Sequence, residues 1–273
     1  MAEAHERAHM ITGLLHPGSG IGNQLHRYVA IRVLALDKGY DFSMAAPENF
    51  KGIDFMNLDM GKPTHFAYHT ESPPGKVVVD YRNLYARGEK MMAGLTIPLW
   101  EEKTNYYNPE FNFIEDDTII DGEFQDPRYF EHRLKDIDKW LAVEPLEMPD
   151  DLCVIGFRGG EFTVFPDLFL TKEYWAEAKI LMLQKNINMR FEVHTDDEVT
   201  AQQFFPDLKV IHNVALNWRS VRFAKHAIIA NSSFFILPRL LSGGDTLAPR
   251  YWARRNIKEW SMPQNYYKQF KYI

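Results

Sequence analysis

The segment from Asp151 to Phe162, DLCVIGFRGGEF, constrains the fold more than any other part of the chain. Five of its first seven residues are apolar with no polar alternation, which is typical of a strand buried on both faces of a parallel sheet. Arg158 follows where this strand should end, and Gly159 and Gly160 let backbone N–H groups approach a ligand closely. This combination indicates an anion site at the carboxyl end of an interior strand. A solvated arginine in a tight turn is the alternative.

The same half of the chain alternates short strand-like segments with segments of helical periodicity. The short segments predict strands over residues 152–157, 190–195, 208–212, 227–230 and 246–248. The periodic segments predict helices that begin at Thr171, near Glu198, near Trp218 and at Phe234. This rhythm predicts an α/β domain with a parallel, doubly wound sheet.

The beginning of the chain predicts a strand, a turn and a helix. An apolar piece at residues 10–15 precedes a turn with Gly18, Gly20 and Gly22, and the helix that follows should end at Gly39. Such a turn directs N–H groups at a phosphate or a sugar oxygen, although its spacing matches neither dinucleotide-binding nor Walker loops.

Residues 41–100 predict only irregular α/β structure, and clearer signals follow them. A strand is predicted at 118–121, and Asp126 followed by Pro127 predicts a helix start. Pro145 and Pro149, with acidic neighbours, predict a domain boundary. We therefore expect an N-terminal domain over 10–145, a C-terminal domain over 150–250, and a tail over 251–273 that packs back on the domains.

Composition excludes several classes of partner. A net charge of -6 and a pI of about 5.9 argue against nucleic acid as the main ligand. The single Cys153 forms no internal disulfide, and no run of residues is long and apolar enough for a transmembrane segment. With a start too polar for a secretory signal, we expect a cytoplasmic protein, with attachment to the inner face of a membrane left open.

A second polar strand end lies at Asn231, Ser232 and Ser233. Hydroxyls, backbone donors and a helix N-terminus there suit phosphate oxygens, while simple N-capping of the next helix explains the serines equally well. Metal binding is not expected, because adjacent side chains such as Asp196 and Asp197 diverge. A solvated turn is the interpretation of that pair. The histidines show no zinc-binding spacing.

Four motifs together resemble the α-1,2-fucosyltransferases of glycosyltransferase family 11. Gly20–Leu25, GIGNQL, resembles the GLGNQ-type opening of that family, and Ile155–Phe162, IGFRGGEF, resembles its HVRRGDY stretch. Gly122–Phe130 is similar to its G-x-x-Q-x-x-x-Y-F segment, and Ala224–Phe234 is similar to C-K-H-N-I-I-A-N-S-S-F. The similarity runs nearly end to end and in the same order.

The resemblance implies a GT-B-like fold, in which two Rossmann-type domains face each other across a cleft. The N-terminal domain would then serve the acceptor, and the C-terminal domain would bind the nucleotide sugar. The implied reaction is an inverting transfer of fucose from GDP-fucose to a hydroxyl of a glycan acceptor, without a metal or other cofactor. The oligomeric state is left open.

The resemblance also assigns roles position by position. Arg158 takes the place of the first motif arginine, and Asn23 that of the asparagine near the sugar. Apart from the resemblance, a carboxylate has to take the proton of the acceptor, and Glu161 and Glu123 are the candidates for this general base. The implied donor-binding residues are Gly22, Asn23, Arg158, Gly159, Asn231, Ser232, Ser233 and Phe234.

The sequence departs from the family pattern at several positions of the arginine motif. Gly156 replaces its histidine, Gly159 its second arginine and Glu161 its aspartate. An arginine holds phosphate through two parallel bonds, which neither lysine nor water reproduces. Two alternatives therefore stay open, namely a catalytically silent relative that binds a nucleotide or glycan, and a transferase that uses another nucleotide sugar.

Overall fold

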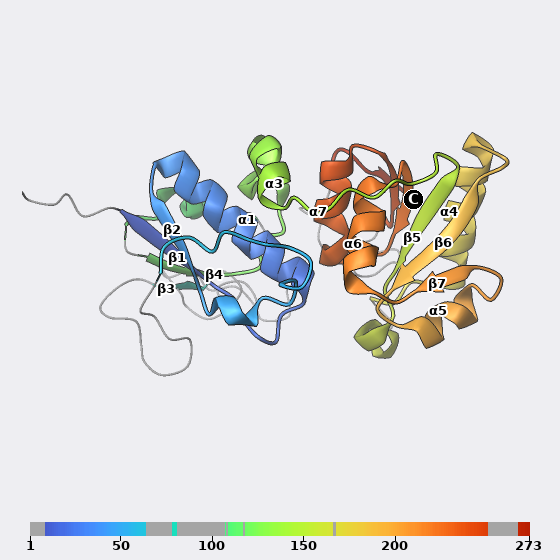
Figure 1. The fold of residues 1–273 in the computed structure, drawn as a ribbon, viewed down its shortest axis with the longest axis horizontal. Coiled ribbons are helices and arrows are strands. Elements are labelled where there is room, and N and C mark those ends of the chain that lie inside the picture. Colours follow the sequence, from blue (N-terminus) through green and yellow to red (C-terminus); the bar gives the residue numbers. More distant parts are fainter. Residues whose placement is uncertain are drawn as a thin grey trace, which may run out of the picture. The chain divides into compact units, whose positions relative to one another are not determined.

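The predicted strands pair into two parallel sheets, and each sheet is the centre of one unit of the chain (Figure 1). The computed structural model describes residues 9–63, 78–80, 107, 109–116, 118–165, 168–250 and 267–273. The first unit comprises Met1–Ile53 and Asn57–Trp140, and the second comprises Asp54–Met56 and Leu141–Ile273.

Within its described residues, the first unit has four parallel strands in the order β2-β1-β4-β3. The strands are β1 (Met10–Leu14), β2 (Asp41–Ala45), β3 (Val78–Asp80) and β4 (Thr118–Asp121). β1 lies inside the sheet, so its residues from Ile11 to Leu14 are buried. The carboxyl end of β1 therefore opens directly into the glycine-rich turn.

The predicted strand, turn and helix at the start of the chain are confirmed. Helix α1 (Ile21–Lys38) follows the turn and packs on β1 and β2. Its apolar side chains, among them Leu25, Val29 and Val33, are buried. Gly39 ends the helix with a φ of 67°, a left-handed conformation that glycine adopts without strain.

The helix predicted to start at Asp126 begins later. Two 3-10 turns, η4 (Pro127–Tyr129) and η5 (Glu131–Arg133), come first, and α3 spans only Leu134–Trp140. Asp126 does cap η4, because its Oδ1 accepts the N–H of Arg128 at 2.9 Å. Phe130 then leaves helical geometry, with φ -150° and ψ -13°, and its ring is completely buried against His26. Burial of this ring outweighs the local helix signal.

The second unit contains, in the part of the chain that the structure describes, six parallel strands in the order β10-β9-β8-β5-β6-β7. They are β5 (Leu152–Phe157), β6 (Arg190–Thr195), β7 (Lys209–Ile211), β8 (His226–Ile229), β9 (Asp245–Ala248) and β10 (Lys271–Tyr272). The chain winds outward from β5 to β7, returns to place β8 on the other side of β5, and winds outward again. This is the strand order of doubly wound dinucleotide-binding sheets.

Four helices of the second unit connect these strands among the described residues. They are α4 (Lys172–Lys185), α5 (Glu198–Phe204), α6 (Val214–Phe223) and α7 (Ser233–Ser242). Because parallel crossovers are right-handed, α4 and α5 lie on one face of the sheet, and α6 and α7, which pack together, lie on the other (Figure 1). The remaining 3-10 turns are η1 (Pro47–Asn49), η3 (Pro109–Phe113) and η6 (Gly160–Val164).

Aromatic side chains fix the carboxyl end of β5. The buried ring of Phe157 lies 5.4 Å from Trp175 of α4, and 5.2 and 5.7 Å from Phe204 and Phe205 at the end of α5, between ring centroids. Such contacts add to the stability that burial of the rings provides. This packing holds the backbone at the end of β5 in place, and Arg158 follows directly after it.

The end of the chain adds a strand to the edge of the second sheet. β10 pairs in parallel with β9, with Lys271 beside Leu247. Residues 251–266 of the predicted tail, and residues 64–77 and 81–106, lie outside the described residues. Among the described helices, none has both the length and the apolar character needed to cross a membrane.

Candidate functional site

The strand order of the second unit reverses between β5 and β8. Both strands are parallel, so their carboxyl ends lie at the same edge, and the backbone N–H of Ala230 donates to the carbonyl of Gly156 at 2.9 Å. In open α/β sheets, ligands bind outside the carboxyl ends of strands at such a reversal. Arg158 and Asn231, which follow the two strands, therefore lie where a ligand is expected.

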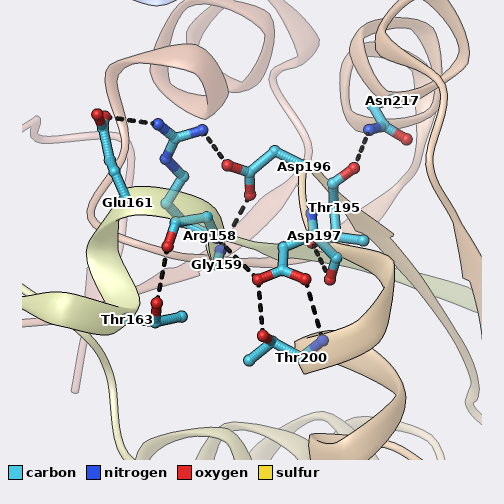
Figure 2. Close-up of polar contacts among 10 residues, drawn as sticks. Arg158, Gly159, Glu161, Thr163, Thr195, Asp196, Asp197, Thr200 and Asn217 are labelled. Atoms are coloured by element: carbon cyan, nitrogen blue, oxygen red, sulfur yellow. Dashed lines mark hydrogen bonds and ion pairs between the residues drawn. The ribbon is translucent and has the colours of Figure 1, made fainter.

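The Arg158 side chain is bound by two carboxylates (Figure 2). Its Nη1 donates to Oδ2 of Asp196, which follows β6, and its Nη2 donates to Oε1 of Glu161 at 2.9 Å. The guanidinium carbon lies 5.0 Å from the ring centroid of Phe162. The side chain is 26% exposed, so it is accessible from solvent despite these contacts.

The two glycines after Arg158 also contact carboxylates. The N–H of Gly159 donates to Oδ1 of Asp196 at 2.9 Å, and the N–H of Gly160 donates to Oδ2 of Asp197 at 3.0 Å. A Cβ on Gly159 would lie 2.6 Å from the Cβ of Asp197, and Gly160 has a φ of 50°. Glycine is therefore required at both positions by the approach of this aspartate pair.

Asp197 has a second task at the start of α5. Its carboxylate accepts the hydroxyl of Thr200 at 2.6 Å and the N–H of Thr200 at 3.0 Å. These hydrogen bonds, the hydroxyl first, hold the pKa of Asp197 below its ordinary value. Asp196 is exposed in a bend, as the interpretation of a solvated turn predicts, but both aspartates also bind the turn that follows β5.

A buried polar network supports the end of β6. Nδ2 of Asn217, in α6, donates to the carbonyl of Thr195 at 2.8 Å (Figure 2). Oδ1 of Asn217 lies 3.0 Å from Nδ1 of His194. The other ring nitrogen of His194 lies 2.9 Å from Oε1 of Glu192. The hydrogen bond from His194 and then that from Lys209 lower the pKa of Glu192 to about 2, against the effect of burial. The network fixes the strand end that carries Asp196.

The residues after β8 do not form the N-cap hydrogen bond that was one explanation for the serines. Ser232 precedes α7, but its side chain makes no capping hydrogen bond. Nδ2 of Asn231 donates to the carbonyl of Leu168 at 2.9 Å, whereas the buried Oδ1 has no hydrogen-bond partner among the described residues. The ring of Phe234 packs against the buried Trp218 at 5.6 Å between centroids, so Phe234 also contributes to the packing of the core. Ser233 is the first residue of α7.

The predicted residues of the first unit lie in the first turn of α1. Oδ1 of Asn23 accepts the side-chain amide of Gln125 at 2.9 Å, and the carbonyl of Gly22 lies 2.8 Å from Nδ1 of His26. Burial lowers the pKa of His26 to about 4. Glu123, the other candidate base, has Oε1 3.7 Å from Nη2 of the buried Arg27. These contacts hold the turn and the start of α1 together.

The structure therefore groups the predicted residues in three places. Arg158, Gly159 and Glu161 are together at the end of β5, Asn231–Phe234 follow the neighbouring strand β8, and Gly22 and Asn23 belong to the first unit. Binding of an anion by Arg158 and by Ser232 and Ser233 stays a prediction. The guanidinium instead binds acidic residues, of which sequence analysis missed Asp196. Its position directly after β6 was the available signal, since β6 was predicted to be a strand of the same sheet.

A nucleophilic thiol and a metal-ligand cluster are two further features by which a protein can carry out chemistry. The thiol of Cys153 is fully buried in β5, and burial raises its pKa to about 12, so it is not a nucleophile at neutral pH. In the described ranges, no group of three or more His, Cys, Asp or Glu residues is placed to hold a metal ion.

Comparisons with known proteins give similarity in solved structures alone. No family model matches the sequence, and no curated protein matches it. Heptosyltransferase WaaC from E. coli, solved with ADP, is 13% identical, with 96% of this chain and 92% of that chain covered and a TM-score of 0.47. Fucosyltransferase NodZ from Bradyrhizobium is 11% identical, with 86% and 94% covered and a TM-score of 0.45. A NodZ α-1,6-fucosyltransferase structure co-crystallised with GDP is also 11% identical, with 86% and 93% covered and a TM-score of 0.43.

These similar structures are glycosyltransferases, and the similarity extends over most of the chain. The predicted α/β fold with parallel sheets is confirmed by the strand pairing in both units. At such identities and scores, the similarity identifies neither donor nor acceptor.

Proposed function

We propose that this protein is a glycosyltransferase that binds its nucleotide-sugar donor at the carboxyl edge of the second sheet. The observation that carries the proposal is the reversal of strand order between β5 and β8, with Arg158 after one strand and Ser232 after the other. Doubly wound sheets bind nucleotides at this point. The motif resemblance supports GDP-fucose as the donor and a glycan hydroxyl as the acceptor.

The two strand ends supply complementary groups for a diphosphate. α7 begins at Ser233, so the positive end of its dipole lies beside Ser232 and favours an anion there. Arg158, which is partly exposed, supplies a planar cation on the neighbouring strand. A diphosphate held between these groups needs no metal ion to balance part of its charge.

In the proposed reaction, the acceptor oxygen attacks the anomeric carbon of fucose while the bond from that carbon to the phosphate oxygen breaks. GDP leaves with the electron pair, and Arg158 stabilises the charge that develops on it. A carboxylate takes the proton of the acceptor hydroxyl, and Glu161 is the proposed base. Asn23 is proposed to contact the sugar. No metal or organic cofactor enters this scheme.

Arg158→Ala tests the placement of the diphosphate. We expect the affinity for GDP to fall by about tenfold or more, because a charged hydrogen-bond donor to phosphate is lost. Calorimetry with GDP, UDP and GMP measures this, and Arg190→Ala is the matched control. Arg190 forms an equally close pair with Asp151, at 2.7 and 2.8 Å, at the opposite end of the same strands. Unchanged GDP affinity in Arg158→Ala places the phosphate elsewhere.

A second candidate is a catalytically silent relative that binds the nucleotide without turnover. It is favoured by the pairing of Arg158 with Asp196 and Glu161, together with glycine at position 159. Release of GDP from GDP-fucose with mixed galactosides separates the two candidates. GDP binding without release with any acceptor supports the silent relative, and a preference for UDP supports a transferase with another donor.

A further inference from the structure

We propose that Asp196 is an internal occupant of the anion site, whose carboxylate fills the place of a ligand phosphate and must leave before a diphosphate binds. This inference rests on the proposed function. According to this inference, Asp196 lowers the affinity of the site for a phosphate ligand. The motif resemblance assigns no role to Asp196.

The contacts of Asp196 are those that a phosphate would make. One carboxylate oxygen accepts the N–H of Gly159 at 2.9 Å, and the other accepts Nη1 of Arg158 (Figure 2). Carboxylate and phosphate both present pairs of oxygens to a guanidinium and to backbone N–H groups. Two of the groups predicted to bind the ligand, the Arg158 guanidinium and the N–H of Gly159, are thus already bound by a carboxylate of the chain itself.

Charge makes simultaneous occupancy unfavourable. Arg158 faces Asp196 and Glu161, and Asp197 binds the next N–H of the same turn. One guanidinium therefore stands among three carboxylates. A diphosphate would bring further negative charge into contact with Asp196, and like charges at such separations repel strongly.

The two aspartates differ in their freedom to move. Asp197 is held by Gly160 and by both donors of Thr200, so it stays as the cap of α5. Asp196 is 32% exposed, and the two contacts described above are to groups that a phosphate would take over. Rotation of Asp196 into solvent therefore exchanges one anion for another, while the end of β6 stays in place.

Asp196→Asn tests the exchange, because it removes the charge and keeps the shape of the side chain. Calorimetry measures binding of inorganic pyrophosphate and of GDP to the wild-type chain and the variant. We expect both ligands to bind about tenfold more tightly to Asp196→Asn, and we expect the gain to vanish when Arg158→Ala is combined with it. Asp151→Asn, which removes the same charge from the pair with Arg190, should leave both affinities unchanged.

Each outcome decides a separate point. If wild type binds GDP and a folded Asp196→Asn binds it no better than Asp151→Asn does, Asp196 is not an occupant of the site, and the proposed function stands. If Asp196→Asn gains affinity for pyrophosphate but shows no preference for any nucleotide, the occupant is confirmed and the proposed function fails. Absence of binding of either ligand to both proteins overturns both proposals. Should Asp196→Asn not fold, Asp196→Ser is measured in the same way.

Discussion

Arg239 is a buried cation whose removal should destabilise the second unit. It lies in α7 with 1% of its surface exposed. Its Nη1 donates to the carbonyls of Val221 and Ala224 at 2.9 and 2.8 Å, at the end of α6. Nε donates to Oγ1 of Thr246 at 2.9 Å, and Nη2 donates to the carbonyl of Asp245 at 3.0 Å. One side chain thus joins α6, α7 and β9.

The expected loss follows from two opposing contributions. Each hydrogen bond from a charged donor contributes about 1.5–3 kcal/mol to the free energy of unfolding. Burial works in the other direction, and it lowers the pKa of Arg239 to about 10, which corresponds to a cost of about 3 kcal/mol. With four such bonds, the balance favours the native arginine. For Arg239→Met we expect a loss of about 4 kcal/mol, the usual size when one member of a buried charged network is removed.

Urea unfolding at pH 7, followed by far-UV circular dichroism and tryptophan fluorescence, measures this loss. The control is Arg190→Met, because Arg190 is exposed on β6 and its pair with Asp151 should contribute less than about 1 kcal/mol. A free energy of unfolding for Arg239→Met within about 1 kcal/mol of wild type would refute the reasoning, since the abandoned carbonyls alone should cost more.

Two further predictions concern the free energy of unfolding at low pH. Burial keeps His26 neutral with a pKa of about 4, so wild-type stability should fall by up to about 3 kcal/mol as pH decreases from 6.5 to 4, because the unfolded chain gains a proton first. In urea titrations, His26→Gln should lack this part of the slope, and an identical slope would contradict the prediction. Glu192, with a pKa of about 2, should stabilise the fold above pH 4.5. Glu192→Gln should therefore lose about 3 kcal/mol at pH 7 and match wild type near pH 2, and a deficit that persists at pH 2 would exclude this linkage.

Local sequence patterns were sufficient to predict most of the strands and helices of the second unit. β6 spans Arg190–Thr195, as predicted, and α7 begins at Ser233, one residue before its predicted start. α6 begins at Val214, before its predicted start, because Oδ1 of Asn213 accepts the N–H of Leu216 at 2.9 Å and caps the helix there. Strand runs and caps are properties of neighbouring residues, so sequence patterns report them well.

Partners that are distant in sequence were not predictable in this way. The break at Phe130 depends on burial against His26, which no local pattern shows. The contact of Arg158 with Asp196 joins residues at the ends of two strands and depends on their register, in which Phe157 lies beside Thr195. From the sequence alone, Asp196 is a charged residue in a turn. The pairing of β5 with β6 makes it a neighbour of Arg158.

Gly159 is one of the positions at which this chain differs from the motif, and it lies where the pairing of β5 with β6 brings Asp196 and Asp197 close to the turn. The motif that Ile155–Phe162 resembles has a second arginine there, but a Cβ at this position would lie 2.6 Å from the Cβ of Asp197. A side chain at 159 and the present position of Asp197 therefore exclude each other, and Asp197 is fixed because it caps α5. An arginine at position 159, as in that motif, is thus incompatible with the observed approach of the aspartate pair. Under the proposed function, we therefore expect the start of α7 to supply charge stabilisation that a second guanidinium would otherwise provide.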